Sequence, residues 1–247
     1  MKKIFAGLAA VAFGVLLILG ISASTDIFRY EDALTEGGAA ARYIAKDVNG
    51  SNGEIVFGET NDAETGSANM VTSVIANYRS FDTLGEVTVL FLASLGVSLL
   101  AGTMVKNGKR KKSGFVLKTS ARFLFPVMLL TGIYIFTHGH LTPGGGFPGG
   151  SMIASSFLLL YLADEGFSTR ISSFKIAEGI AGLLYTAIGA TGLLVGGYFL
   201  MNFLPTGTVG SLLSGGIIPI VYVLIGLKVG SEITGIVSSM YNGEVKV

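Results

Sequence analysis

The chain has no cysteine, no tryptophan, only two histidines and few charged residues. Without cysteine it forms no disulfide, thiolate nucleophile or cysteine-ligated metal cluster. The two histidines, His138 and His140, argue against a transition-metal site built from protein ligands alone, and no metal or cofactor is expected. Only 13% of the residues are charged, against about 25% in soluble domains. With a formal net charge of +1, the composition excludes a basic nucleic-acid-binding protein and a water-soluble enzyme.

Long apolar runs are abundant instead. Half of the 247 residues are hydrophobic, and the mean hydropathy is +0.66. A hydrocarbon core about 30 Å thick needs about 20 helical residues, and five of six apolar segments meet that length. The sequence predicts an all-α integral membrane protein with six transmembrane helices, one with a broken or Gly-rich beginning. The predicted spans are 4–21, 83–105, 119–137, 149–163, 176–200 and 213–239.

The first of these segments has two interpretations. Lys2-Lys3, the apolar run and Ser22-Ala23-Ser24 fit a secretory signal with a cleavage site. The same run also fits a retained helix, and we take it as one.

The charges are unevenly distributed along the chain. Six of the 17 basic residues lie between Lys106 and Lys118, and 11 of the 16 acids lie between Asp26 and Glu86. Basic loops stay in the cytoplasm, so residues 106–112 are expected there, with both termini, and the long acidic loop outside. Within that loop, residues 70–78 have helical spacing of apolar residues and predict a short amphipathic helix. The chain is thus predicted to be a multi-pass protein of the cell membrane.

Asp82 and Glu86 form the first candidate site, at the start of the second span. They are four residues apart and share a helix face. A carboxylate inside a span is costly and by default marks proton or cation handling. A structural interpretation is equally open: Thr83 and Glu86 match a capping box, and Arg79 is placed to pair with Asp82.

A second candidate is the segment from Thr137 to Gly150, which contains both histidines, six glycines and two prolines. Met152 to Ala163 alone is about 18 Å long at 1.5 Å per residue, so the glycine-rich run is expected at membrane depth. Irregular backbone there is tolerated in protein or along a wet cavity and points to an ion site. Histidine titrates near neutral pH; alternatively, both rings simply bond backbone carbonyls. The broken-helix motif comprises Thr142, Pro143, Gly144, Gly145, Gly146 and Phe147.

Lys228 and Glu232, four residues apart in the last span, form the third candidate. A desolvated lysine can exchange protons within a membrane. The alternative is that Lys228 extends toward the headgroups and keeps its charge in water. No nucleophile–base pair or metal set accompanies these residues, so independent catalysis is not expected.

These motifs are familiar. His138 to Gly150 and Gly226-Leu-Lys-Val-Gly230 closely resemble the MrpB/MnhB subunit of Mrp-type multisubunit sodium/proton antiporters, over about residues 111–247. Pro148 stands where that family usually has a polar residue. Tyr78 to Val89 resembles the C-terminal segment of the large MrpA subunit. The chain thus resembles a fusion of an MrpA-like segment, 1–110, with an MrpB/MnhB-like domain, 111–247.

The resemblance implies a non-catalytic membrane subunit of a sodium- and proton-translocating module without redox centres of its own. A detached MrpA tail resembles archaeal membrane-bound hydrogenases and the related sulfane sulfur reductase. Expected partners are therefore other Mrp-type membrane subunits, with hydrogenase-like or flavin-reductase-like subunits beside them, and Na+ and H+. From the cost of burying charges and the side of the membrane that the residues share, the predicted ion path is Asp82, Glu86, His138, His140, Lys228 and Glu232; a purely structural subunit is the alternative.

Overall fold

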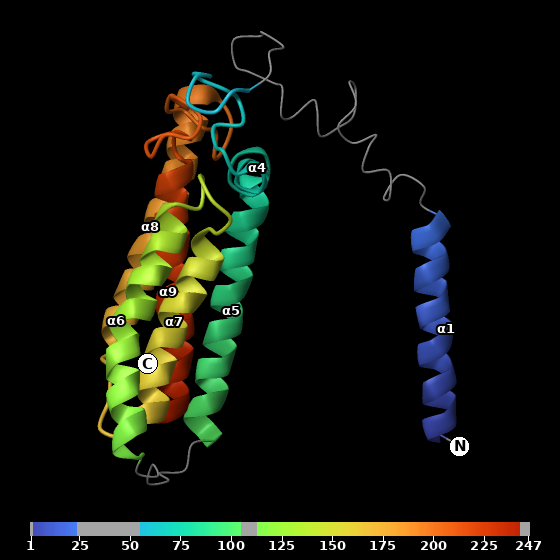
Figure 1. The fold of residues 1–247 in the computed structure, drawn as a ribbon, viewed down its shortest axis with the longest axis vertical. Helices are drawn as coiled ribbons and strands as arrows, with labels where there is room; N and C mark the ends of the chain where they lie inside the picture. The colour runs from blue at the N-terminus through green and yellow to red at the C-terminus, as the bar shows by residue number, and fades with distance from the viewer. Residues whose placement is uncertain (1, 24–54, 105–112, 243–247) are drawn as a thin grey trace. The chain divides into compact units, whose positions relative to one another are not determined.

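A computed structural model describes residues 2–23, 55–104 and 113–242 (Figure 1). The helix α1 (Lys2–Ala23) belongs to one unit and residues 55–242 to another, and each unit is described by itself. Over these ranges the long elements are helices, and an isolated β-bridge pairs Asn61 with Thr208. The all-α prediction is confirmed. The basic loop 106–112 and most of the acidic loop lie outside the described residues.

The second unit contains five long helices, which pack against one another and run side by side (Figure 1). All five are long and apolar enough to cross a membrane, and α1 contains a shorter apolar stretch, Val11–Gly20. Residues 70–78 are helical, as predicted, but as two short pieces. The elements are α4 (Met70–Ser73), η1, a π-helix (Val74–Tyr78), α5 (Ser80–Met104), α6 (Phe115–Thr137), α7 (Gly146–Ala163), α8 (Ile171–Gly196) and α9 (Ile218–Asn242).

The fourth span differs from the prediction. We expected the glycines and prolines to prevent a regular helix up to Gly150, yet α7 begins at Gly146 and has 18 residues. Pro148 is tolerated because it lies in the first turn, where the missing N–H has no intrahelical partner. The irregular backbone is confined to residues 138–145 and ends at Gly145, whose φ of 132° requires glycine. Gly146 and Phe147 are therefore helical, and the helix is not broken within its span.

The glycines of α7 serve close helix packing. A methyl group on Gly149 would lie 2.7 Å from the carbonyl oxygen of Gly132 on α6. A methyl group on Gly150 would lie 2.8 Å from the carbonyl oxygen of Gly226 and 2.9 Å from the amide nitrogen of Gly230, both on α9. Small residues at helix interfaces allow this approach. Glycine-rich sequence here means contact between backbones rather than a broken helix.

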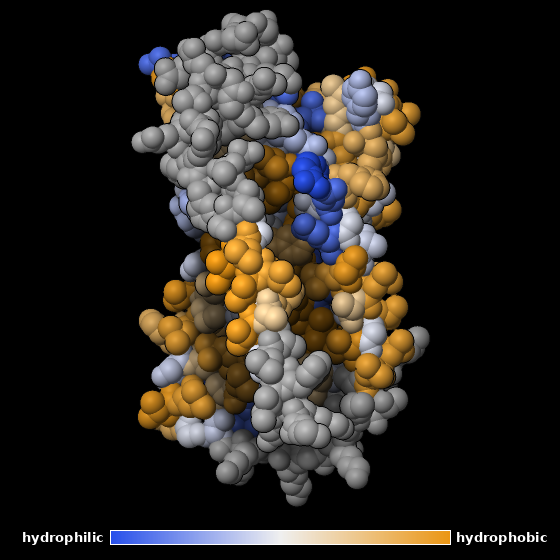
Figure 2. Space-filling view, turned by 90° about the vertical axis from the view of Figure 1, so that its right-hand side faces the viewer, coloured by the Kyte–Doolittle hydropathy of each residue, from blue (hydrophilic) through white to orange (hydrophobic). Residues whose placement is uncertain are grey.

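Helix α9 is central to the second unit. It packs against α5, α6, α7 and α8, and it contacts η1 at its beginning. Its inward residues form the main apolar core with Val87 of α5 and Tyr185 of α8. Helices α5, α6 and α8 present many large exposed hydrophobic side chains, and in Figure 2 hydrophobic residues cover most of the surface that is not grey. This distribution is typical of a helix bundle surrounded by lipid or by other membrane subunits.

Two loops close one end of the bundle over the start of α9. The amide of Gly58 donates to the carbonyl of Val209 (2.9 Å), and that of Asp62 donates to the carbonyl of Gly207 (3.0 Å). The Asp62 carboxylate accepts the Gly207 amide in return (3.0 Å). We call residues 55–69, 138–145 and 197–217 the cap.

Substituting Gly150 by alanine should destabilise the bundle, because the added methyl meets two backbone atoms of α9 that side-chain rotation cannot move. Overpacking of this kind costs about 1–3 kcal/mol, read as a lower midpoint of thermal unfolding in detergent. Gly96→Ala is the control, since a methyl there meets nothing within 4 Å. Equal midpoints for the two variants would contradict the packing described here.

Candidate ion-handling site

Three ionisable side chains meet between α8 and α9. The ammonium of Lys228 lies 3.6 Å from a carboxylate oxygen of Glu232, one turn later on α9, and 4.0 Å from a carboxylate oxygen of Glu178 on α8. The ring of Phe91, from α5, lies 5.1 Å from the same ammonium. We call Glu178, Lys228 and Glu232 the charge cluster. The predicted pairing of Lys228 with Glu232 is confirmed, whereas Lys228 does not extend toward water.

The cluster is buried unevenly. The exposed fraction of the side chain is 0% for Glu232, 10% for Lys228 and 13% for Glu178. Both carboxylate oxygens of Glu232 lack a hydrogen-bond partner among the described residues. Buried charges are costly unless they are paired and hydrogen-bonded. A group held under these conditions in a membrane protein is a functional candidate.

Glu178 was missed in the sequence analysis. It lay near the start of the predicted span 176–200, but α8 begins at Ile171, so Glu178 is two turns inside the helix. An acid within a predicted apolar span was a sufficient signal. Its pairing with Lys228, 50 positions away, depends on the packing of α8 against α9.

The irregular segment 138–145 is held by backbone-directed hydrogen bonds. The side-chain amide of Asn69 donates to the carbonyls of Gly139 (2.9 Å) and Thr142 (3.0 Å). The hydroxyl of Thr72 donates to the same Gly139 carbonyl (2.7 Å) and accepts from the hydroxyl of Tyr222 on α9 (3.0 Å). Because these contacts join α4, the segment and α9, they fix where the histidines lie.

His140 is completely buried, and its Nε2 lies 3.1 Å from the carbonyl oxygen of Leu212. The carbonyl can only accept, so this nitrogen carries the proton, and the unprotonated Nδ1 has no hydrogen-bond partner among the described residues. Burial lowers the pKa of His140, and the positive character of His138 lowers it further, against the opposing effect of the Leu212 carbonyl.

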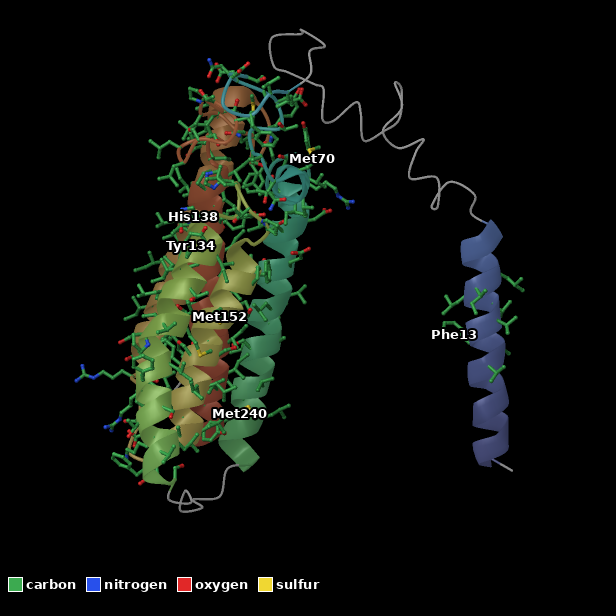
Figure 3. The ribbon with its side chains drawn as sticks, viewed as in Figure 1. Phe13, Met70, Tyr134, His138, Met152 and Met240 are labelled. Atoms are coloured by element: carbon green, nitrogen blue, oxygen red, sulfur yellow. The ribbon has the colours of Figure 1, made fainter. Side chains whose placement is uncertain are left out.

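His138 lies at the end of α6, where Figure 3 shows it beside Tyr134. The two rings are stacked with centroids 4.3 Å apart, and Nδ1 lies 3.1 Å from the Tyr134 carbonyl oxygen. The carbonyl of His138 also accepts a hydrogen bond from the Thr142 hydroxyl (3.2 Å). Both histidines thus bond backbone carbonyls, as the structural interpretation of this motif requires.

Asp82 and Glu86 lie on the exposed side of α5. Asp82 forms an ion pair with Arg79 at the surface, as the sequence suggested. The predicted capping box does not form, because α5 begins at Ser80 and the Thr83 hydroxyl donates to the carbonyl of Ile75 (2.6 Å). Among the described residues no hydrogen bond or ion pair connects this pair of acids to either histidine.

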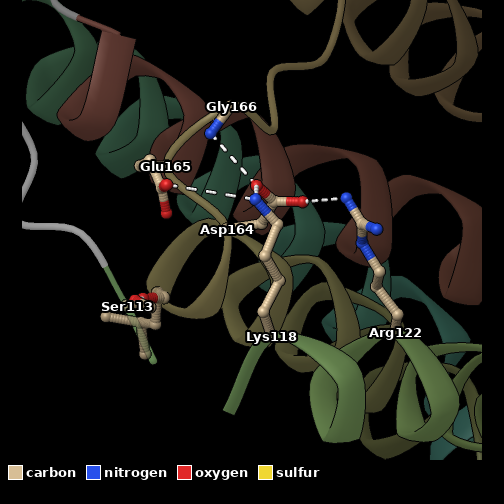
Figure 4. Close-up of polar contacts among 7 residues, drawn as sticks. Ser113, Lys118, Arg122, Asp164, Glu165 and Gly166 are labelled. Carbon is tan, nitrogen blue, oxygen red and sulfur yellow. Dashed lines mark hydrogen bonds and ion pairs between the residues drawn. The ribbon is translucent and has the colours of Figure 1, made fainter. Parts of the chain in front are cut away.

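A second ion cluster, also missed in the sequence analysis, lies at the end of the bundle opposite the cap. Asp164, the residue after α7, is 2.6 Å from the ammonium of Lys118 and 2.6 Å from the guanidinium of Arg122, both on α6 (Figure 4). Hydrogen bonds from Lys118 and Arg122 lower the pKa of Asp164 to about 2. The amide of Gly166 adds a third donor at 3.1 Å, so the cluster ties α7 to α6.

The fold and the charge cluster define an all-α, multi-pass membrane protein with ionisable side chains inside its helix bundle. The described residues contain no group of three His, Asp or Glu able to hold a metal ion. Residues 116–235 match the family described as a domain related to the MnhB subunit of Na+/H+ antiporter. Over 98 residues the chain is 38% identical to a Na+/H+ antiporter subunit of Alkalihalophilus pseudofirmus, covering 38% of this chain and 67% of that protein. The chain belongs to the MnhB family.

Two solved structures share the fold. A chain of the membrane-bound sulfane sulfur reductase, an archaeal respiratory membrane complex, is 41% identical, with a TM-score of 0.75 over 97% of this chain and 98% of that one. A chain of the Mrp complex from Dietzia sp. DQ12-45-1b is 24% identical, with a TM-score of 0.67 over 98% of this chain and 26% of that one. The second likeness concerns the fold alone. The family match begins at residue 116, so the MrpA-like origin of the front part stays a prediction.

Replacing Asp164 by asparagine should weaken the tie between α6 and α7. Because the pKa of Asp164 is lowered to about 2 from 3.8, its contribution to stability is fully present above pH 3.8 and is lost as the pH falls toward 2. Asp164→Asn should therefore lower the midpoint of thermal unfolding at neutral pH, with the difference shrinking at acidic pH. Exposed Glu59 provides the control: Glu59→Gln should leave the midpoint unchanged. A pH-independent effect of Asp164→Asn would contradict the ion-pair account.

Acidification should loosen the cap through His140. Its pKa in the folded chain is lowered from 6.5, so the unfolded chain binds a proton first and stability is lost as the pH falls below about 6.5. Hydrogen exchange of the backbone around Leu212, corrected for the intrinsic rate, should rise in this range. His140→Gln should remove the pH response, whereas His138→Gln should keep it. An unchanged response in His140→Gln would assign the effect to another group.

Proposed function

We propose that this chain is a non-catalytic subunit of an Mrp-type Na+/H+ antiporter module and contributes to its cation or proton path. Membership of the MnhB family supports the module. The likeness to a chain of an archaeal respiratory membrane complex, at 41% identity over nearly the whole of both chains, supports a redox-driven host complex. On this proposal, other Mrp-type membrane subunits surround the chain, and hydrogenase-like or flavin-reductase-like subunits carry the redox chemistry.

The observation that carries a direct role in transport is the charge cluster. Lys228 lies between carboxylates from two different helices, and Glu232 is completely buried with no hydrogen bond to its oxygens among the described residues. A subunit that only supports its neighbours gains nothing from this arrangement, since hydrophobic residues of similar volume stabilise a bundle at least as well. Buried ionisable groups in a membrane by default mark an ion path.

The remaining predicted residues form the outer half of the proposed path. Asp82 and Glu86 are exposed on α5, so a path along them requires a neighbouring helix from another subunit to complete it. His138, His140 and the motif Thr142 to Phe147 lie at or beside the cap, the end where α5 begins. The charge cluster lies near the middle of α9, whose residues 218–242 are centred on position 230, so the proposed path leads from the cap to the centre of the bundle.

Orientation and domain origin complete the proposal. The basic segment 106–112 places the loop between α5 and α6 in the cytoplasm, which puts the cap outside and both termini inside the cell. Residues 1–110 then correspond to an MrpA-like segment and 111–247 to the MnhB-like domain. The matched family range, 116–235, falls within the second part.

A structural subunit is the second candidate. It is favoured by the cap, where His138, His140 and Asn69 all bond backbone carbonyls and thereby hold the loops in place. In that case the outer polar residues maintain shape, and transport passes through larger partners.

Substitutions in the assembled complex separate these candidates. In proteoliposomes, Glu232→Gln and Lys228→Gln should each reduce Na+/H+ exchange at least about tenfold, which corresponds to about 1.4 kcal/mol, while the complex still assembles on native gels. Glu86→Gln and His138→Ala should also reduce exchange if the outer path is right. Glu59→Gln is the control and should leave exchange unchanged. Loss of assembly instead of exchange would favour the structural subunit, and unchanged exchange in all four variants would exclude the path.

A further inference from the structure

We propose that Glu178, Lys228 and Glu232 form a site that holds one exchangeable proton, shared between two carboxyl groups, with the lysine ammonium in the position that a metal cation would otherwise take. The inference deepens the proposed function, because it names the ligand of the charge cluster. It rests on the geometry and burial of these three residues.

The charges of the cluster do not balance. Two carboxylates and one ammonium leave a net charge of −1 among side chains that are 0%, 10% and 13% exposed. Among the described residues, α7, which packs against α9, has no acidic or basic residue between Gly146 and Ala163, and α5 contributes the ring of Phe91 to the cluster. Lys175, three residues before Glu178, also attracts that carboxylate, but its side chain is exposed, so the buried groups themselves keep the excess negative charge. Because an uncompensated buried charge is costly, one proton on either carboxyl makes the cluster neutral.

The surroundings favour a proton over a sodium ion. Hard cations are bound by several oxygen ligands arranged around them. Here the ammonium of Lys228 already lies between the two carboxylates, within 4.0 Å of both. The oxygens of Glu232 have no hydrogen-bond partner among the described residues, so the ammonium is the group that balances their charge. A proton needs only one oxygen and leaves the ammonium in place.

The uneven burial distinguishes the two carboxyl groups between which the proton moves. Glu178 is the most exposed of the three side chains, and Glu232 is sealed inside the bundle. When the proton is on Glu232, the ammonium pairs with the ionised Glu178; when it is on Glu178, the ammonium pairs with the ionised Glu232. Movement of the proton from one carboxyl to the other leaves the total charge unchanged. The flexible stem of Lys228 passes over Gly182, where even an added methyl would lie 3.8 Å away, so it has room to change partner.

Counting protonated carboxyl groups tests the site. In the purified complex that contains this chain, infrared difference spectra against the wild type report the C=O band of protonated carboxyl groups near neutral pH. The charge cluster is neutral when the number of bound protons equals the number of carboxyl groups minus the number of ammonium groups. Glu178→Gln and Glu232→Gln should each lose one protonated carboxyl, and Lys228→Met should gain one. Glu165, whose carboxylate lies 4.0 Å from the ammonium of Lys118 in the other ion cluster, provides the control: Glu165→Gln should change nothing.

The expected gain of one protonated carboxyl group in Lys228→Met distinguishes an effect at the site from misassembly, because a misassembled complex would not produce this gain. Exchanging Na+ for K+ should leave the band unchanged; loss of the band on adding Na+ would mean that a metal cation displaces the proton and would overturn the proposal. Retention of the band in both glutamine variants would also overturn it. The spectra report protonation whether or not the complex transports ions. Unchanged transport with the expected bands would therefore refute the proposed function and leave this site intact.

Discussion

Helix α9 packs against four other long helices, so every polar group on its inner side must find a partner within the protein. This constraint governs the rest of the bundle. Thr234 meets it by donating to the carbonyl of Gly230 in its own helix (2.6 Å), and Ser238 accepts a hydrogen bond from Tyr161 of α7 (2.8 Å). Lys228 and Glu232 meet it only in part, through each other and Glu178. The charges of these three residues therefore remain unbalanced, which makes them the candidates for ion exchange.

Close packing around α9 depends on glycine. Gly150 of α7 lies against Gly226 and Gly230 of α9, and Gly149 lies against Gly132 of α6. In a membrane, where lipid is as apolar as leucine, such contact supplies much of the driving force for helix association. The charge cluster lies on the other side of α9, against α8, and its three side chains are at most 13% exposed. Burial of this degree strengthens the electrostatic interactions within the cluster.

The two ends of the bundle are held by different interactions. At the cap, hydrogen bonds to backbone carbonyls position residues 138–145, and a buried neutral His140 takes part. At the opposite end, Asp164 joins α7 to α6 through two cations. The cap is thus sensitive near the ordinary range of histidine titration, whereas the ion pairs of Asp164 persist until the pH is strongly acidic. Between these two ends lies the cluster proposed to exchange protons.

The amino-acid sequence by itself determined the class of protein, the positions of five long apolar helices to within about five residues and the pairing of Lys228 with Glu232, because hydropathy and i, i+4 spacing are local properties of a helix. It also identified the MnhB-like motifs. Local rules failed where distant residues decide the outcome. They made the α7 glycines helix breakers, because the backbones that those glycines contact belong to α6 and α9. They could not pair Glu178 with Lys228, because the two residues are on different helices. Only the tertiary structure brought two carboxylates to one ammonium, since that juxtaposition arises from the packing of α8 on α9.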